Sequence, residues 1–142
     1  MPDRPDRHRS ATATGPGRLL IAVYAIFALS ATARAGVQIA TRFSEAPVPY
    51  LLSLLAGVVY ILATIGLAGR APWSRRLAWV AVVFELVGVL TVGTLSLVDA
   101  ADFPDDTVWS GFGRGYGFVP LVLPIAGLWW LIHTGRVARK VH

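Results

Sequence analysis

Glu85 is the residue whose type and surroundings point most directly to chemistry. It is the single charged residue in the apolar run from Leu77 to Val98. At a rise of about 1.5 Å per residue it lies roughly 9 Å past Trp79, too deep in hydrocarbon for its carboxyl to reach water easily. An ionisable group at that depth costs about 2.5 to 3.5 kcal/mol on insertion scales, so it suggests a function such as binding and releasing a proton or a cation.

Hydroxyl side chains on other apolar runs are expected at the depth of Glu85. These are Tyr24, Tyr60 and Thr64, and residues 126–130 of the last apolar run should lie at the same level. Hydrogen bonds between polar side chains also join helices inside a membrane. Two interpretations of Glu85 therefore stay open: a proton or cation site, or a protonated side chain that holds helices together.

Arg34 is the second intramembrane charge, roughly 22 Å along its helix from Leu19 and therefore in the far half of the membrane. Its level differs from that of Glu85 by about 13 Å, so no ion pair between the two is expected. Asp99 or Asp102, in the loop beyond the third run, is the predicted partner of Arg34.

A polar stripe at four-residue spacing accompanies Arg34, because Ser30, Gln38 and Arg42 lie at that spacing from one another and from it. Residues four apart share one face of a helix. The stripe is expected to face the bundle or a water-filled vestibule, where it either takes part in transport or only locks its helix to the acidic loop.

The segment from Asp99 to Gly117 carries four aspartates and four alternating glycines. Its aspartates lack the spacing and the following glycine of an EF-hand loop. Its glycines resemble a phosphate-binding loop, but such loops follow a strand in a soluble domain. The expectation is a solvated acidic loop that lies flat on the bundle. No metal and no cofactor is predicted, and no histidine is placed to ligate haem or to complete a catalytic triad.

Four apolar runs must position these side chains. A membrane helix needs about 20 mostly apolar residues, and the runs lie near 19–42, 50–68, 77–98 and 116–133. The sequence therefore predicts an all-α polytopic membrane protein, a bundle of four transmembrane helices over residues 18–135. A disordered cytoplasmic tail over 1–17 precedes it, and a second tail over 136–142 follows it.

Proline and run length set the expected ends of these helices. Pro47 and Pro49 are expected in the link that ends the first helix. The fourth run holds fifteen apolar residues from Phe118 to Ile132. It is short for a span, so its helix should recruit residues before Phe118 or lie in thinned bilayer.

Charge gives the orientation. Ten of the thirteen basic residues fall in the two tails and the turn around residues 70–76, so the positive-inside rule places both termini in the cytoplasm of a bacterial plasma membrane. Aromatic anchors are expected at both interfaces: Trp73, Trp79, Trp129 and Trp130 on the inner side, and Tyr50, Trp109 and Tyr116 on the outer side.

Composition excludes several classes of protein. The chain has no cysteine, which removes disulfide exchange, thiolate nucleophiles and cysteine-ligated metals. Its net charge of +5 is divided between membrane sides and forms no aromatic-interleaved basic patch, so no nucleic-acid binding is expected. One alternative is that the first run is a cleavable signal peptide ending near Ala33. Against it, Thr32, Gly36 and Ala40 have the four-residue spacing of a helix that packs closely on a neighbour.

The runs ATARAGVQIATRF, LVGVLTVGTLSLVD and WSGFGRGYGFVPLVLPIAGLWWL resemble a family of small uncharacterised four-span membrane proteins of GC-rich, actinobacterial-type Gram-positive bacteria. The resemblance covers residues 18–135 and implies a topology without an activity. Small multidrug transporters match poorly, because their essential glutamate is in the first helix, where this chain has Arg34.

The expected function is that of an accessory or scaffold protein, associated with itself or with a larger membrane complex, and not that of an enzyme. The alternative is a small transporter or proton-coupled permease that uses Glu85 and Arg34. The lipid bilayer is the expected surrounding in both cases.

Overall fold

The structure is a computed structural model that describes the backbone of residues 15–141 and the side chains of residues 15–135. Over this range it is all-helical, as predicted, with no strand. The long helices are α2 (Pro16–Arg42), α3 (Pro47–Ala68), α4 (Pro72–Val98) and α5 (Val119–Val141). Short 3₁₀ turns follow α2 and α4: η1 (Phe43–Glu45), η2 (Ala100–Asp102), η3 (Ser110–Phe112) and η4 (Arg114–Tyr116).

Proline begins the long helices. Pro16, Pro47 and Pro72 each occupy the first position of a helix, and Pro120 occupies the second position of α5. A missing amide hydrogen costs nothing there, because the first amides of a helix have no partner within it. Pro47 was expected in the link between helices, and the structure places it inside α3 instead.

Each long helix has more residues than the span predicted for it. The fourth helix differs most, because it begins at Val119 and gains length at its far end, up to Val141. Its span was expected near 116–133, either with residues recruited before Phe118 or in thinned bilayer. The backbone of 136–141 therefore continues α5. Of the predicted N-terminal tail, residues 1–14 lie outside the described residues.

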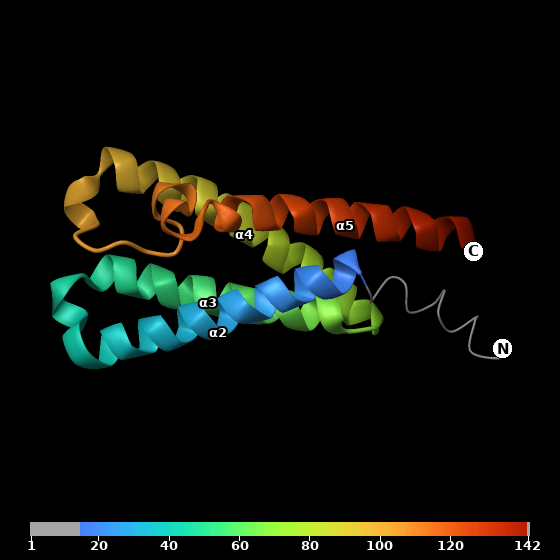
Figure 1. Ribbon diagram of the computed structural model, residues 1–142, viewed down its shortest axis with the longest axis horizontal. Helices are drawn as coiled ribbons and strands as arrows, with labels where there is room; N and C mark the ends of the chain where they lie inside the picture. The colour runs from blue at the N-terminus through green and yellow to red at the C-terminus, as the bar shows by residue number, and fades with distance from the viewer. Residues whose placement is uncertain (1–14, 142) are drawn as a thin grey trace.

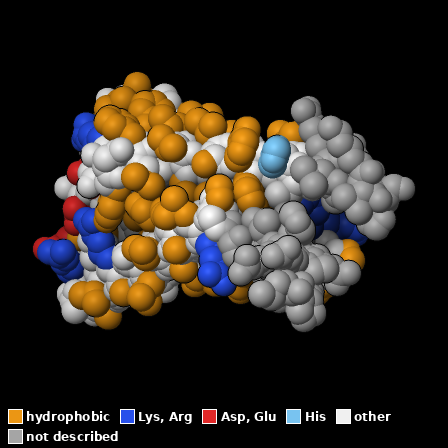
Figure 2. Space-filling view, turned by 45° about the vertical axis from the view of Figure 1, so that its right-hand side comes forward, with side chains coloured by type: hydrophobic (Ala, Val, Ile, Leu, Met, Phe, Trp, Pro, Cys, Tyr) orange, Lys and Arg blue, Asp and Glu red, His pale blue; other side chains and the backbone are white. Residues whose placement is uncertain are grey.

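Three described helical segments are long and apolar enough to cross a membrane: Pro16–Glu45, Pro47–Ala68 and Pro72–Val98. A fourth candidate is a broken one, in which Ser110–Tyr116 and Val119–Gly135 meet at an angle of 99°. The described residues thus contain three to four possible spans, which indicates a membrane protein. Figure 2 agrees, since apolar side chains cover much of the described surface on the face it shows while acidic side chains gather at one end.

The helices pack in chain order. α2 and α3 form an antiparallel pair, α3 packs on α4, and α4 packs on α5 (Figure 1). α2 and α5 are in contact over a short stretch only. The start of α2, the α3–α4 turn and the end of α5 lie at one end of the molecule, and the loop between α4 and α5 folds back into the other end.

Small residues bring α2 and α3 together. A side chain at Gly57 would come within 2.5 Å of the Thr32 hydroxyl, so the helices approach closely there. Ala28, Ala31 and Ala35 continue the buried face of α2. Of the predicted small-residue stripe only Thr32 makes this contact, because Gly36 and Ala40 are exposed. Close approach of backbones is the usual way that membrane helices gain packing energy.

Candidate functional site

Glu85 of α4 lies at the centre of the described core and is fully buried, with 0% of its surface exposed. The hydroxyl of Tyr24, on α2, donates a hydrogen bond of 2.5 Å to its Oε1 atom. Tyr24 is also fully buried. The predicted approach of Tyr24 to Glu85 is therefore confirmed. The second carboxyl oxygen, Oε2, has no hydrogen-bond partner among the described residues.

Helix α5 reaches the same point through Gly127. A side chain at Gly127 would come within 3.2 Å of the Tyr24 hydroxyl and of Val82. Gly127, one of the residues 126–130 that were expected at the level of Glu85, therefore lies against Tyr24. Because glycine leaves room here, α5 closes over the hydroxyl that binds Glu85.

Tyr60 of α3 is part of the same buried cluster but has a different hydrogen-bond partner. Its ring centroid lies 6.2 Å from that of Tyr24, while its hydroxyl accepts a hydrogen bond of 2.8 Å from the indole nitrogen of Trp109. Thr64 bonds to the Tyr60 carbonyl at 2.7 Å, within its own helix. The structure thus brings Tyr24 to the carboxyl of Glu85, places Tyr60 beside Tyr24, and leaves the Thr64 hydroxyl bonded elsewhere.

The second part of the loop between α4 and α5 enters the bundle, against the prediction of a solvated loop, whereas Asp99, Asp102 and Asp106 are exposed as expected. Thr107, Val108, Trp109 and Ser110 are all buried, with Trp109 only 1% exposed. A side chain at Gly88 would come within 2.6 Å of the Trp109 ring. Trp109 was expected as an outer interface anchor. It instead fills the space between α3 and α4, beside Gly88, which follows Glu85 by three residues on α4.

Phe112 gives the loop a second fixed point. Its ring lies directly over Gly93, where any added side chain would collide with it. Its backbone has φ 62°, a left-handed conformation that costs a residue other than glycine about 1 to 3 kcal/mol. The surrounding packing must offset that cost, so the path of the loop is held by specific contacts with α4.

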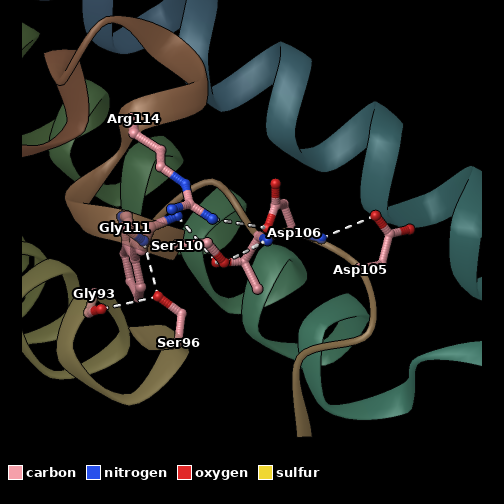
Figure 3. A network of polar contacts seen from close by, with 9 residues as sticks. Gly93, Ser96, Asp105, Asp106, Ser110, Gly111 and Arg114 are labelled. Carbon is pink, nitrogen blue, oxygen red and sulfur yellow. Dashed lines mark hydrogen bonds and ion pairs between the residues drawn. The ribbon is translucent and has the colours of Figure 1, made fainter. Parts of the chain in front are cut away.

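Hydrogen bonds from side chains to the backbone complete the hold on the loop (Figure 3). Ser96 of α4 donates to the Gly93 carbonyl and accepts from the Gly111 amide, each at 2.8 Å. The Ser110 hydroxyl accepts from the Thr107 amide at 2.8 Å. These bonds satisfy polar groups that burial would otherwise leave unpaired.

Two aspartates of the loop, Asp105 and Asp106, make contacts that hold its acidic part in place. Tyr50 of α3 donates to Asp105 at 3.0 Å, and Tyr50 itself is buried, not an interface anchor as predicted. Arg114 and Asp106 approach to 4.0 Å, but both are mostly exposed. Such an exposed pair contributes about 0 to 1 kcal/mol, so the Tyr50 bond is the stronger contact.

Arg34 has a different partner from the one predicted. Its guanidinium donates to the Tyr116 hydroxyl at 2.6 Å, and no ion pair joins it to Asp99 or Asp102 among the described residues. The loop folds inward, which brings Tyr116 to α2 in their place. The pKa of Asp99 lies above its ordinary value, first because of the neighbouring carboxyl of Asp102.

The polar stripe on α2 does not face inward as a whole. Gln38 is buried at 3% exposure and its Oε1 has no hydrogen-bond partner in the part of the chain that the structure describes, whereas Ser30, Arg34 and Arg42 are exposed. Arg42 instead lies 3.9 Å from Glu45, three residues along the chain. Four-residue spacing drifts around a helix with 3.6 residues per turn, which turns the members of the stripe to different sides.

Comparison of the chain with protein-family models, with curated proteins and with solved structures gave no match. The chemistry of Glu85 has to be inferred from its own geometry. A buried carboxyl with one bonded and one unpartnered oxygen can hold a proton and can join helices. Among the described residues, no group of three acidic or histidine side chains could hold a metal ion.

Sequence reasoning did not place some of the residues around Glu85 and the inward loop: Trp109, Tyr116 and the glycines of α4. One signal was available, because the nineteen residues from 99 to 117 are long for a plain surface connection. Loops above about 12 to 15 residues without structure of their own are uncommon in compact domains.

Proposed function

We propose that the chain is a four-span protein of a bacterial plasma membrane, with both ends in the cytoplasm, that serves as an accessory or scaffold subunit without catalysis of its own. The bent pair formed by η3, η4 and α5 supplies the fourth span. The basic ends then lie inside, and the acids of the loops lie outside.

A closed interior is the observation that carries this proposal. Glu85 accepts a hydrogen bond of 2.5 Å from Tyr24, and Trp109 fills the neighbouring space between α3 and α4. The two hollows described, one between α2 and α5 and one between α2 and α3, are lined by apolar side chains apart from Thr32 and Thr64. Contacts with other molecules are therefore favoured on the sides of the helices.

Photo-crosslinking in native membranes tests the accessory role. A photoreactive residue replaces Leu29 of α2 or Val80 of α4, whose surfaces are 75% and 66% exposed. The matched control replaces Val82, which is fully buried. Adducts of higher mass from an exposed site, and none from Val82, are expected. Recovery of nothing but monomer from both exposed sites would contradict the proposal.

A second candidate function follows from the free oxygen of Glu85. A small proton-coupled permease would use this carboxyl to take up and release a proton, with Arg34 toward the outer side. The unpartnered Oε2 atom supports it, because a buried acceptor without a partner has binding capacity left. Proton flux into liposomes should then be lost in Glu85→Gln and kept in Glu45→Gln, and equal flux in both would remove this candidate.

A further inference from the structure

Residues 105–116, the second part of the α4–α5 loop, hold together mainly through their own hydrogen bonds. The Thr107 hydroxyl accepts from the Trp109 amide at 3.0 Å, and the Ser110 hydroxyl accepts from the Thr107 amide at 2.8 Å. The Phe112 amide bonds to the Trp109 carbonyl at 3.1 Å. All three bonds begin and end inside the segment, so they would move with it if it were displaced as a unit.

Fewer hydrogen bonds join this segment to the long helices. Within residues 15–135 there are four of them to α2, α3 and α4, formed by the pairs Tyr116 and Arg34, Asp105 and Tyr50, Trp109 and Tyr60, and Gly111 and Ser96. The bond between Tyr116 and Arg34 is exposed. The segment is therefore held to the bundle at a few points, and one of them is open to the surroundings.

Two aromatic rings pack the segment against α4. Trp109 lies over Gly88 and Phe112 lies over Gly93, and neither glycine has a side chain that interlocks with the ring. The backbone is left-handed at Phe112, with φ 62°, and again just beyond the segment at Phe118, with φ 60°. Both residues carry a side chain, so this conformation is strained, and strain of this kind recurs in switch regions. Departure of the segment would relieve it.

The segment covers one side of Glu85. Val89 and Gly93 follow Glu85 at four-residue spacing, so the three residues lie on one face of α4. Glu85 and Val89 are both fully buried, and Gly93 lies under the Phe112 ring. The Oε2 atom of Glu85 has no partner among the described residues, so it is an acceptor for a water molecule that reaches it. Displacement of the segment would open a route to this atom from the loop end of the molecule.

We infer that residues 105–116 are a plug, which closes the loop end of the bundle over Glu85 and lifts to give water and protons access to its carboxyl. The exposed bond between Arg34 and Tyr116 is the latch of this plug. The inference deepens the second candidate function and rests on it, because a carboxyl that takes up and releases protons needs a route that opens and closes.

Thiol labelling tests the opening. The chain has no cysteine, so Val89→Cys introduces a single thiol at a buried position. A membrane-impermeant maleimide is added to right-side-out vesicles, and slow labelling from the outer side is expected. Tyr116→Phe removes the latch hydroxyl but keeps the ring, which packs on Phe27 with centroids 5.7 Å apart. It should accelerate labelling about fivefold, equivalent to about 1 kcal/mol for one hydrogen bond.

Thr94→Val is the matched control for the latch. The Thr94 hydroxyl is also exposed, but it bonds at 2.8 Å to the Leu90 carbonyl within α4 and not to the plug. Labelling of Val89→Cys should keep its rate in this variant. Equal rates in Tyr116→Phe and Thr94→Val would overturn the inference, since the latch would then have no effect on access.

Val82→Cys shows whether the loop end alone opens. Val82 is fully buried three residues before Glu85, and it lies against α5 at Gly127 instead of against the plug. Its thiol should stay unlabelled when Tyr116→Phe is added. Equal acceleration at positions 82 and 89 would contradict a plug, because the whole bundle would then be opening.

A disulfide can hold the plug closed. The Cγ atom of Phe112 lies 2.8 Å from the Cβ position at Gly93. The Cβ positions of the two residues are therefore no more than about 4.3 Å apart, close enough for a disulfide. In Val89→Cys with Gly93→Cys and Phe112→Cys, oxidation should stop labelling at position 89, located by peptide mass, and reduction should restore it. Equal labelling before and after reduction would count against the plug.

Failure of the underlying proposals is distinguishable from failure of the plug. Equal proton flux in Glu85→Gln and Glu45→Gln would remove the permease alone, since labelling at position 89 measures opening without any flux. Labelling that depends on the latch only in inverted vesicles would contradict the proposed orientation and support the plug.

Discussion

The indole nitrogen of Trp109 donates a hydrogen bond of 2.8 Å to the hydroxyl of Tyr60, and this bond joins the α4–α5 loop to the centre of α3. The two rings also meet edge to face, with centroids 6.3 Å apart. Tyr60 packs in turn on Tyr24, whose hydroxyl binds Glu85. The loop is therefore connected to the buried carboxyl through two tyrosines.

Trp109→Phe should lower the melting temperature measured in detergent. A six-membered aromatic ring remains, but the Tyr60 hydroxyl loses its donor, which costs about 0.5 to 1.5 kcal/mol for a hydrogen bond, and the smaller side chain adds the cost of the space it leaves in the buried site. Trp129→Phe is the matched control, because Trp129 is 59% exposed and has no such bond. Equal melting temperatures for the two variants would show that the Trp109 bond contributes nothing.

Gly88→Ala should destabilise the fold by about 1 to 3 kcal/mol through overpacking. Its new methyl group would lie 2.6 Å from the Trp109 ring, which has no room to move within the buried loop. Gly36→Ala is the control, since nothing lies within 4 Å of that position. It should leave stability unchanged or raise it, because alanine favours helix. The measurement is thermal unfolding of the two variants. A Gly88→Ala variant as stable as the unchanged protein would show that the Trp109 ring does not pack tightly against α4.

Tyr24→Phe should cost more stability than Glu85→Gln. The phenylalanine leaves the carboxyl without its donor, at about 1 to 3 kcal/mol for a buried polar group, whereas the glutamine oxygen still accepts from Tyr24. A double-mutant cycle that combines Tyr24→Phe with Glu85→Ala, which removes the acceptor, should give a coupling energy near 1 kcal/mol for unfolding in detergent, within the range of membrane hydrogen bonds. Additive effects would mean that the two side chains do not act together.

Arg75→Ala should loosen α5 around Leu131 and Thr134. Its guanidinium binds the Leu131 carbonyl and, at 3.1 Å, the Thr134 hydroxyl. Both contacts are lost in alanine, so amide hydrogen exchange should accelerate over residues 128–135. Arg76→Ala, one position along and exposed, should not accelerate it. Unchanged exchange in both variants would rule out Arg75 as the anchor of α5.

The Asp99–Asp102 contact should make stability depend on pH. The pKa of Asp99 is raised, so the folded chain keeps this proton to higher pH than the unfolded chain does. The resulting stability is complete below the ordinary pKa of about 3.9 and is lost as pH rises through the raised value. Asp102→Asn should reduce this dependence in thermal unfolding, while Asp106→Asn should not.

The sequence by itself determined where the helices lie and which polar groups share a depth. Apolar run length and proline are local properties, so they predicted four long helices. Helical rise is constant, and counting residues therefore brought Tyr24 to the level of Glu85 and separated Arg34 from it.

Only the tertiary structure decided the path of the α4–α5 loop. Its composition is polar and rich in glycine, which is also typical of a solvated connection. Burial of Trp109 depends on space left by Gly88, and the position of Phe112 depends on Gly93. These contacts join residues far apart in the chain, and no spacing within the loop encodes them. The partner of Arg34 changed for the same reason, since an inward loop presents Tyr116 to α2 where an outward one would have presented aspartates.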